Sequence, residues 1–142
     1  MANTLYTAFR QGILDALYDL NTASIKVALV RSYTFNAAHA TMADITSAGG
    51  VINGTSAALT NPVITGGVYD ADDTTITTTS STSNHALVLY QASAVTGGAD
   101  VAAGSQRLIA YYDTGTGLPV QPGTGNLAIT WANTTNKIFK IG

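Results

Sequence analysis

Short segments of apolar and β-branched residues, separated by small polar residues, run through the chain from residue 24 onward. Such segments are typical of β-strands, and no long helical pattern alternates with them, which argues against a parallel α/β sheet. The expected strands span residues 25–31, 51–53, 58–65, 74–79, 85–91, 106–113, 126–132 and 137–141. The pattern therefore predicts a mainly β fold, an antiparallel β-sandwich, with a jelly roll as one candidate topology.

The residues between these segments predict how the strands are joined. Pro62 cannot donate a ladder hydrogen bond, so the strand that contains it is expected at a sheet edge. Residues 133–136, Asn-Thr-Thr-Asn, predict a hairpin between the last two strands. Two loops, residues 92–105 and 114–125, are rich in small residues.

Two helices are expected beside the strands. Apolar residues of the first segment fall on one helical face, namely Leu5, Phe9, Ile13, Leu17 and Leu20. Asn3 or Thr4 could cap this helix, and Gly12 costs about 1 kcal/mol relative to alanine, so the helix needs tertiary packing. It would cover one end of the sheet or act as an arm that reaches a neighbour. A short second helix is expected over residues 36–45, capped by Asn36.

The chain length fits one domain. Its 142 residues are enough to bury a core without metals or cross-links. We expect a single domain over residues 1–142, with an N-terminal helix and arm in residues 1–22 and the β-sandwich in residues 23–142.

The polar surface is unusually poor in charge. Charged residues make up 10% of the sequence, well below the roughly 25% of an average domain, and glutamate is absent. Hydroxyl-rich surfaces cost little to desolvate, which fits extended contact with neighbours, since the centres of protein interfaces are depleted in charge. The alternative is a monomer with unusual amino-acid usage.

The same composition excludes several partners. The net charge is −2 and the six basic residues are scattered along the sequence, which argues against nucleic-acid binding. No apolar run approaches the roughly 20 residues that cross a bilayer, so we expect no membrane partner and a soluble protein. The N-terminal residues lack the pattern of a signal peptide.

Little in the sequence points to catalysis. The absence of cysteine excludes disulfides, thiolate metal sites and a cysteine nucleophile. His39 and His85 are the only side chains that ordinarily titrate near neutrality, and no Gly-x-Ser-x-Gly elbow is present. We therefore expect neither enzymatic activity nor a cofactor.

One cluster of carboxylates is a weak candidate for a metal site. Asp70, Asp72 and Asp73 could contribute oxygen ligands to calcium, but the glycine and later acidic residue of a calcium loop are missing. A polar turn, with Asp side chains bonded to backbone amides, is the favoured interpretation.

The order of the segments resembles small β-rich virion structural proteins of tailed bacteriophages, over nearly the whole chain. The segments that carry the resemblance are MANTLYTAFRQGILDALYDL, SIKVALV, GVYDADDTTIT, LVLYQ, RLIAYYDTGTGLPV, LAITW and KIFKI. The resemblance implies a capsid decoration (cement) protein, a jelly-roll-like or related β-sandwich that assembles in the host bacterial cytoplasm and resides in the virion. Its implied partners are the major capsid protein and other copies of itself, and it implies no catalytic residues.

Contacts with such partners are expected at the N-terminal helix, at residues 33–45 and at the two loops. The candidate interface residues are Leu5, Tyr6, Phe9, Tyr33, Phe35, His39, Tyr112, Leu118 and Val120. Adjacent Tyr111 and Tyr112 should point to opposite faces of a strand, which leaves one of them at a rim or an interface. The alternatives are a phage tail or baseplate component and a carbohydrate-binding module that uses Tyr112 or Trp131.

Overall fold

Strands dominate the computed structural model, which describes residues 3–78, 86–118, 120 and 125–142. Strands make up 39% of the chain and helices 13%, and the strand pairs are antiparallel. The predicted mainly β, antiparallel fold with two helices is therefore confirmed. A jelly roll remains a prediction.

The largest sheet has five strands. Their order is β1 (Thr4–Leu5), β8 (Arg107–Tyr112), β7 (Ala86–Ser93), β2 (Ser24–Arg31) and β3 (Val51–Thr55). All eight residues of β7 are buried, because other elements cover both faces of the sheet at its centre. Burial on both faces explains why the sequence of β7 has a continuous apolar centre instead of alternating apolar and polar residues.

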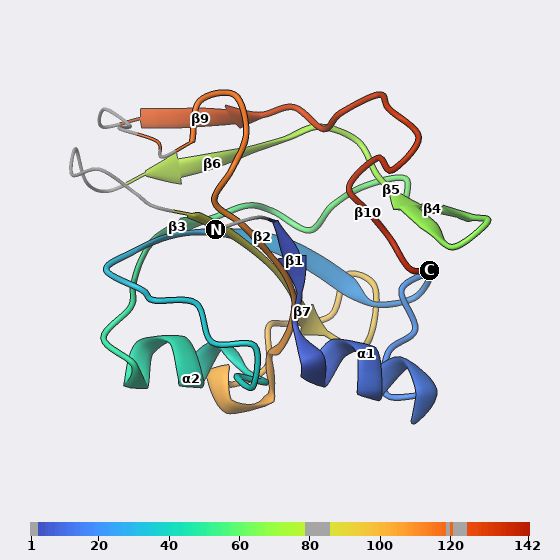
Figure 1. Cartoon of the computed structure of the whole chain (residues 1–142), viewed down its shortest axis with the longest axis horizontal. Coiled ribbons are helices and arrows are strands. Elements are labelled where there is room, and N and C mark those ends of the chain that lie inside the picture. Colours follow the sequence, from blue (N-terminus) through green and yellow to red (C-terminus); the bar gives the residue numbers. More distant parts are fainter. Residues whose placement is uncertain (1–2, 79–85, 119, 121–124) are drawn as a thin grey trace.

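Two smaller sheets and two helices surround this sheet. One small sheet contains β10 (Phe139–Lys140), β5 (Val68–Asp70) and β4 (Val63–Thr65), and the other pairs β6 (Thr74–Thr78) with β9 (Gly125–Ile129). In Figure 1, α1 (Thr7–Leu14) and α2 (Met42–Ser47) lie on one side of the five-stranded sheet, and β6 and β9 lie on the opposite side. A single-turn 3₁₀ helix, η1 (Ala103–Ser105), precedes β8. The molecule is thus layered around the five-stranded sheet.

The predicted hairpin between the last two strands is wrong. β9 pairs with β6, and β10 pairs with β5, so residues 133–136 connect two different sheets. The pairing of β10 with β5 lets the ring of Phe139 stack on the ring of Tyr69, with ring centroids 5.2 Å apart. The predicted edge position of the Pro62 segment is confirmed, because β4, directly after Pro62, lies at the end of its sheet.

The first helix is shorter than predicted. α1 ends at Leu14, and the chain then reverses through Ala16, which has a φ of +54°. The reversal lays the ring of Tyr18 against Gly12, where a Cβ atom would overlap the ring. Gly12 is therefore required by the packing of Tyr18. Leu17, predicted on the buried face, is 48% exposed because it lies beyond the helix.

Neither predicted helix cap is correct. Tyr6 occupies the N-cap position of α1 without a side-chain hydrogen bond, and Asn3 binds the backbone of Thr114. The second helix begins at Met42 instead of residue 36, because Thr41 and Asp44 form a capping box. Asn36 closes a local turn, in which its Oδ1 accepts a hydrogen bond from the N–H of Ala38 at 3.0 Å.

Candidate functional site

Three of the predicted interface residues belong to the hydrophobic core. Tyr6 and Phe9 are fully buried, and Tyr33 is 6% exposed. The prediction that these side chains face a partner is corrected for the folded chain: they pack α1 and the segment after β2 against the sheet. A helical apolar face has the same sequence pattern whether it packs on its own sheet or on a neighbour, which is why the sequence did not separate the two.

The predicted contact region around residues 33–45 forms a packed polar and aromatic network. The hydroxyl of Tyr33 lies 2.9 Å from Nδ1 of His39 and 3.4 Å from the hydroxyl of Tyr6. Phe35 is half-buried, with its ring 5.2 Å from that of Tyr6 and 4.9 Å from that of Tyr111. These contacts hold the segment against β8. His85 lies outside the described residues.

The three aspartates of the candidate metal cluster face different neighbours. Asp70 pairs with Lys137 at 3.2 Å, and Oδ1 of Asp73 accepts the backbone N–H of Trp131 at 2.9 Å. Oδ2 of Asp72 accepts hydrogen bonds from Thr60 and Asn61. Within the residues that the structure describes, no group of three His or Asp side chains gathers to hold a metal ion. The carboxylates instead fasten a turn to the segments on either side.

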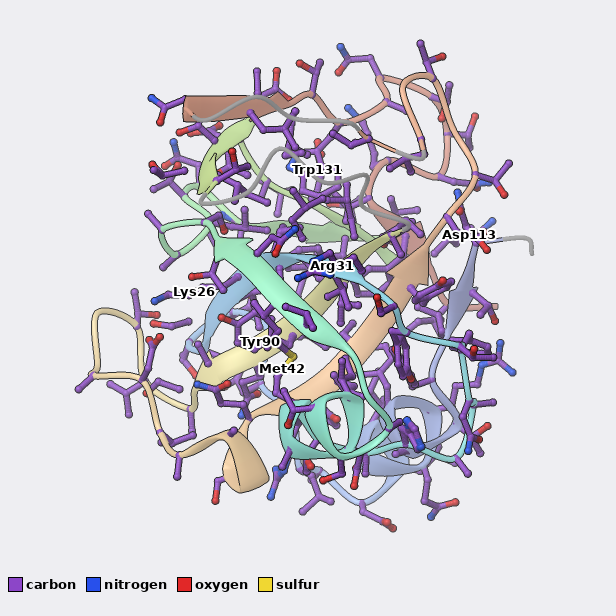
Figure 2. All side chains as sticks on the ribbon, turned by 90° about the vertical axis from the view of Figure 1, so that its left-hand side faces the viewer. Lys26, Arg31, Met42, Tyr90, Asp113 and Trp131 are labelled. Atoms are coloured by element: carbon purple, nitrogen blue, oxygen red, sulfur yellow. The ribbon has the colours of Figure 1, made fainter. Side chains whose placement is uncertain are left out.

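The remaining candidates at the C-terminal half come together around one cavity. Tyr112, Leu118 and Val120 line a cavity of about 620 Å³, which we call the apolar cleft. Its walls also include Leu87, Leu127, Ile129 and Trp131. Figure 2 shows Trp131 near the β6–β9 sheet, whereas Met42 of α2 lies nearer the middle of the molecule. The structure thus brings together three residues that the sequence only suggested separately.

Hydrogen bonds orient the two aromatic side chains of the apolar cleft. The hydroxyl of Tyr112 donates to the carbonyl of Ile138 at 2.9 Å, and burial raises the pKa of this phenol. The indole Nε1 of Trp131 donates to the carbonyl of Asp72 at 3.1 Å. The two rings lie 6.4 Å apart at 55°. Tyr111 and Tyr112 do face opposite sides of β8, as predicted, since Tyr111 packs on Phe35.

A second hollow adjoins the apolar cleft and is lined by basic residues. Its volume is about 600 Å³, and Arg10, Lys137 and Lys140 lie in its wall; we call it the basic pocket. Leu5, another predicted interface residue, also lines it. The lining residues shared by both hollows are Asn3, Tyr112, Lys137 and Ile138. The two hollows therefore adjoin each other and share part of their walls.

The basic pocket was missed in the sequence because its cations come from distant positions. The basic residues are scattered along the chain, yet three of the six meet in this wall. No spacing rule relates a residue on the first helix to two near the last strand. The aromatic residues directly before Arg10 and Lys140, Phe9 and Phe139, carry the only local signal, since buried aromatic residues often pack together.

An apolar wall beside a group of cations can bind a ligand that carries both an apolar and an anionic group. Apolar walls accept large side chains, and arginine and lysine donate charge-assisted hydrogen bonds to anions.

Among the described residues, no helix is long and apolar enough to span a membrane. In comparisons with known proteins, no family model, curated protein sequence or solved structure matches the chain significantly.

Proposed function

We propose that this chain is a non-enzymatic structural protein of a virion, a capsid decoration protein that binds the assembled lattice of the major capsid protein. The observation that supports this proposal best is the pair of adjoining hollows, the apolar cleft and the basic pocket. Strand residues, among them Leu87, Tyr112 and Ile129, form part of the walls of the apolar cleft, and loop residues form the rest. The resemblance of the spaced segments to phage virion proteins points to the same class.

The physical properties of the surface fit repeated binding to a shell. A lattice presents the same site many times, so contacts of modest strength are multiplied wherever one decoration unit reaches several sites. A protein that binds the assembled lattice but not free subunits stabilises the lattice by mass action. The low charge of the chain lowers the desolvation cost of such contacts.

Binding to purified capsids tests the proposal directly. Particles that lack this protein would be mixed with the purified chain, sedimented and analysed for bound copies, with dissociated capsid subunits as the control. We expect saturable binding to particles only, together with a higher temperature of capsid disassembly. A folded chain that leaves the capsids unoccupied would contradict the proposal.

Copy number distinguishes a shell protein from a tail or baseplate component. Quantitative mass spectrometry of whole virions should find hundreds of copies for a shell protein. A few copies, or dozens, would assign the chain to the tail.

The neighbouring aromatic residues of the apolar cleft favour one other candidate, a carbohydrate-binding module, because sugars stack on aromatic rings.

A glycan array tests the carbohydrate alternative. If the module binds sugars, the wild-type chain should show hits that disappear in Trp131→Ala, whose indole lines the apolar cleft. An array without hits for the wild-type chain would remove this candidate, and capsid binding would be unaffected by that result.

A further inference from the structure

The basic pocket gathers half of the basic residues of a chain whose net charge is negative. Arg10, Lys137 and Lys140 line one hollow, while the other three basic residues lie elsewhere. We propose that this pocket binds a carboxylate of a protein segment whose neighbouring apolar side chain enters the apolar cleft. Identifying that segment as part of the major capsid protein rests on the proposed function, whereas the chemistry of the pocket does not.

Core packing places two of the cations together. The rings of Phe9 and Phe139 meet edge to face, with centroids 5.5 Å apart and an interplanar angle of 84°. Each ring is buried, and the next residue along the chain, Arg10 or Lys140, is exposed. The contact between the two rings therefore places Arg10 and Lys140 in the wall of the same pocket. No hydrogen bond or ion pair holds either charged group among the residues that the structure describes.

The third cation lies where the two hollows meet. Lys137 lines both of them, and its Nζ is 3.2 Å from the carboxylate of Asp70. Its backbone has a φ of +48°, a left-handed conformation that non-glycine residues rarely adopt. Asp70 offsets the charge of Lys137, so Arg10 and Lys140 are the cations of the pocket that have no ion-pair partner among the described residues.

These charges favour a carboxylate ligand. Like charges held near one wall repel each other, and an anion between them removes this cost. Both guanidinium and ammonium groups form charge-assisted hydrogen bonds with carboxylates. The adjoining apolar cleft, with Leu118, Leu127 and Trp131 in its wall, would accept a large apolar side chain. A peptide offers both groups a few ångströms apart.

Nucleic acid fits this surface less well. Binding to its backbone relies on many cations spread along a groove or a stripe, whereas this pocket contains three and the chain has a net charge of −2. The adjoining wall is apolar, which would exclude phosphates. We therefore assign the pocket to a protein segment and treat nucleic acid as an outcome of the test.

Titration of the isolated full chain with a deca-aspartate peptide tests the assignment. In low salt, amide and side-chain NMR shifts should centre on Arg10, Lys140 and Asn3, and they should weaken as salt screens the charges. The pocket variant Arg10→Gln/Lys140→Gln should bind the peptide about ten-fold more weakly, as expected for the loss of charge-assisted contacts.

A second double variant controls for net charge. Lys26→Gln/Arg31→Gln removes the same charge outside the pocket, where Lys26 pairs with Asp100, and should bind like the wild type. Equal affinity of both double variants, or no shifts around Arg10 and Lys140, would overturn the proposal. So would tighter binding of deca-thymidylate to the same residues. These outcomes involve no capsid, so they leave the proposed function to be decided by the occupancy experiment.

Discussion

Phe9 of α1 and Phe139 of β10 come from opposite ends of the chain and pack edge to face in the core, with ring centroids 5.5 Å apart. Phe139 also stacks on Tyr69 of β5, and Phe9 meets the ring of Tyr18 at 4.9 Å. This row of aromatic residues fastens the first helix to the three-stranded sheet. Of these aromatic residues, Phe139 also lines the basic pocket, next to Lys140.

Truncation of Phe9 should weaken the whole fold. Phe9→Ala removes a fully buried ring with two aromatic neighbours, so we expect the free energy of unfolding to fall by about 3–5 kcal/mol. Urea unfolding followed by circular dichroism measures it. Leu14→Ala on the same helix is the control, since Leu14 is 82% exposed and its loss should cost less than about 0.5 kcal/mol. Equal effects of both variants would contradict this packing.

A methyl group at Gly54 should disturb the contact between β3 and β6. A Cβ atom there would overlap the carbonyl oxygen of Thr77 and approach Cγ2 of Ile76 to 2.8 Å. We expect Gly54→Ala to lower the melting temperature, at a cost of about 1–3 kcal/mol. Gly104→Ala is the matched control because no atom lies within 4 Å of its added methyl group. If thermal unfolding cannot distinguish the two variants, the close approach of β3 and β6 is wrong.

The capping box of α2 should contribute stability that depends on pH. Backbone N–H groups of Ala40 and Thr41 bond to Oδ2 of Asp44 and hold the pKa of this carboxyl below its ordinary value. The ionised carboxylate is favoured by folding, so its contribution is present above the ordinary aspartate pKa of about 4 and lost as the pH falls further. Asp44→Ala should cost about 1 kcal/mol at pH 7.

Measurement of this cost at two pH values tests its origin. Denaturant titrations of the wild type and Asp44→Ala would be compared at pH 7 and pH 2. The difference in unfolding free energy should shrink at pH 2, where the wild-type carboxyl takes up a proton. An equally large difference at both pH values would mean that the side chain acts through packing rather than charge.

Buried phenols should make the fold sensitive to alkali. Burial raises the pKa of Tyr18, Tyr69 and Tyr90 to about 12, from an ordinary value of 10.0. The folded chain therefore holds protons that the unfolded chain releases, so stability is unaffected below pH 10 and falls as the pH rises from 10 to 12. Urea unfolding across this range should show the decline.

The variant Tyr69→Phe isolates the contribution of one phenol to the loss of stability in alkali. Tyr69→Phe keeps the ring stacked on Phe139 and should change stability at pH 7 by less than about 1 kcal/mol. The decline above pH 10 should be shallower than in the wild type. An identical decline in both chains would show that burial does not raise the pKa of the Tyr69 phenol.

Most strands of this protein could be predicted from local patterns alone. The segments around β2, β6, β7 and β8 lie within two residues of their predicted ends, because their β-branched and apolar residues suit a buried pleated surface. The edge position of β4 followed from Pro62, whose ring removes a backbone donor. These properties belong to individual residues or to short windows.

The partners of those strands were decided only by the tertiary structure. Side chains that are far apart in the sequence determine three features that local patterns did not predict. These features are the separation of β9 from β10, the short α1 and the burial of Tyr6. The basic pocket is the clearest case, because Arg10 and Lys140 become neighbours through the contact of Phe9 with Phe139. By itself the sequence determined strand-forming segments and a charge-poor surface, since these follow from local preference and composition. Only packing, which selects among many pairings by buried area and fit, decided which segments meet and where the charges gather.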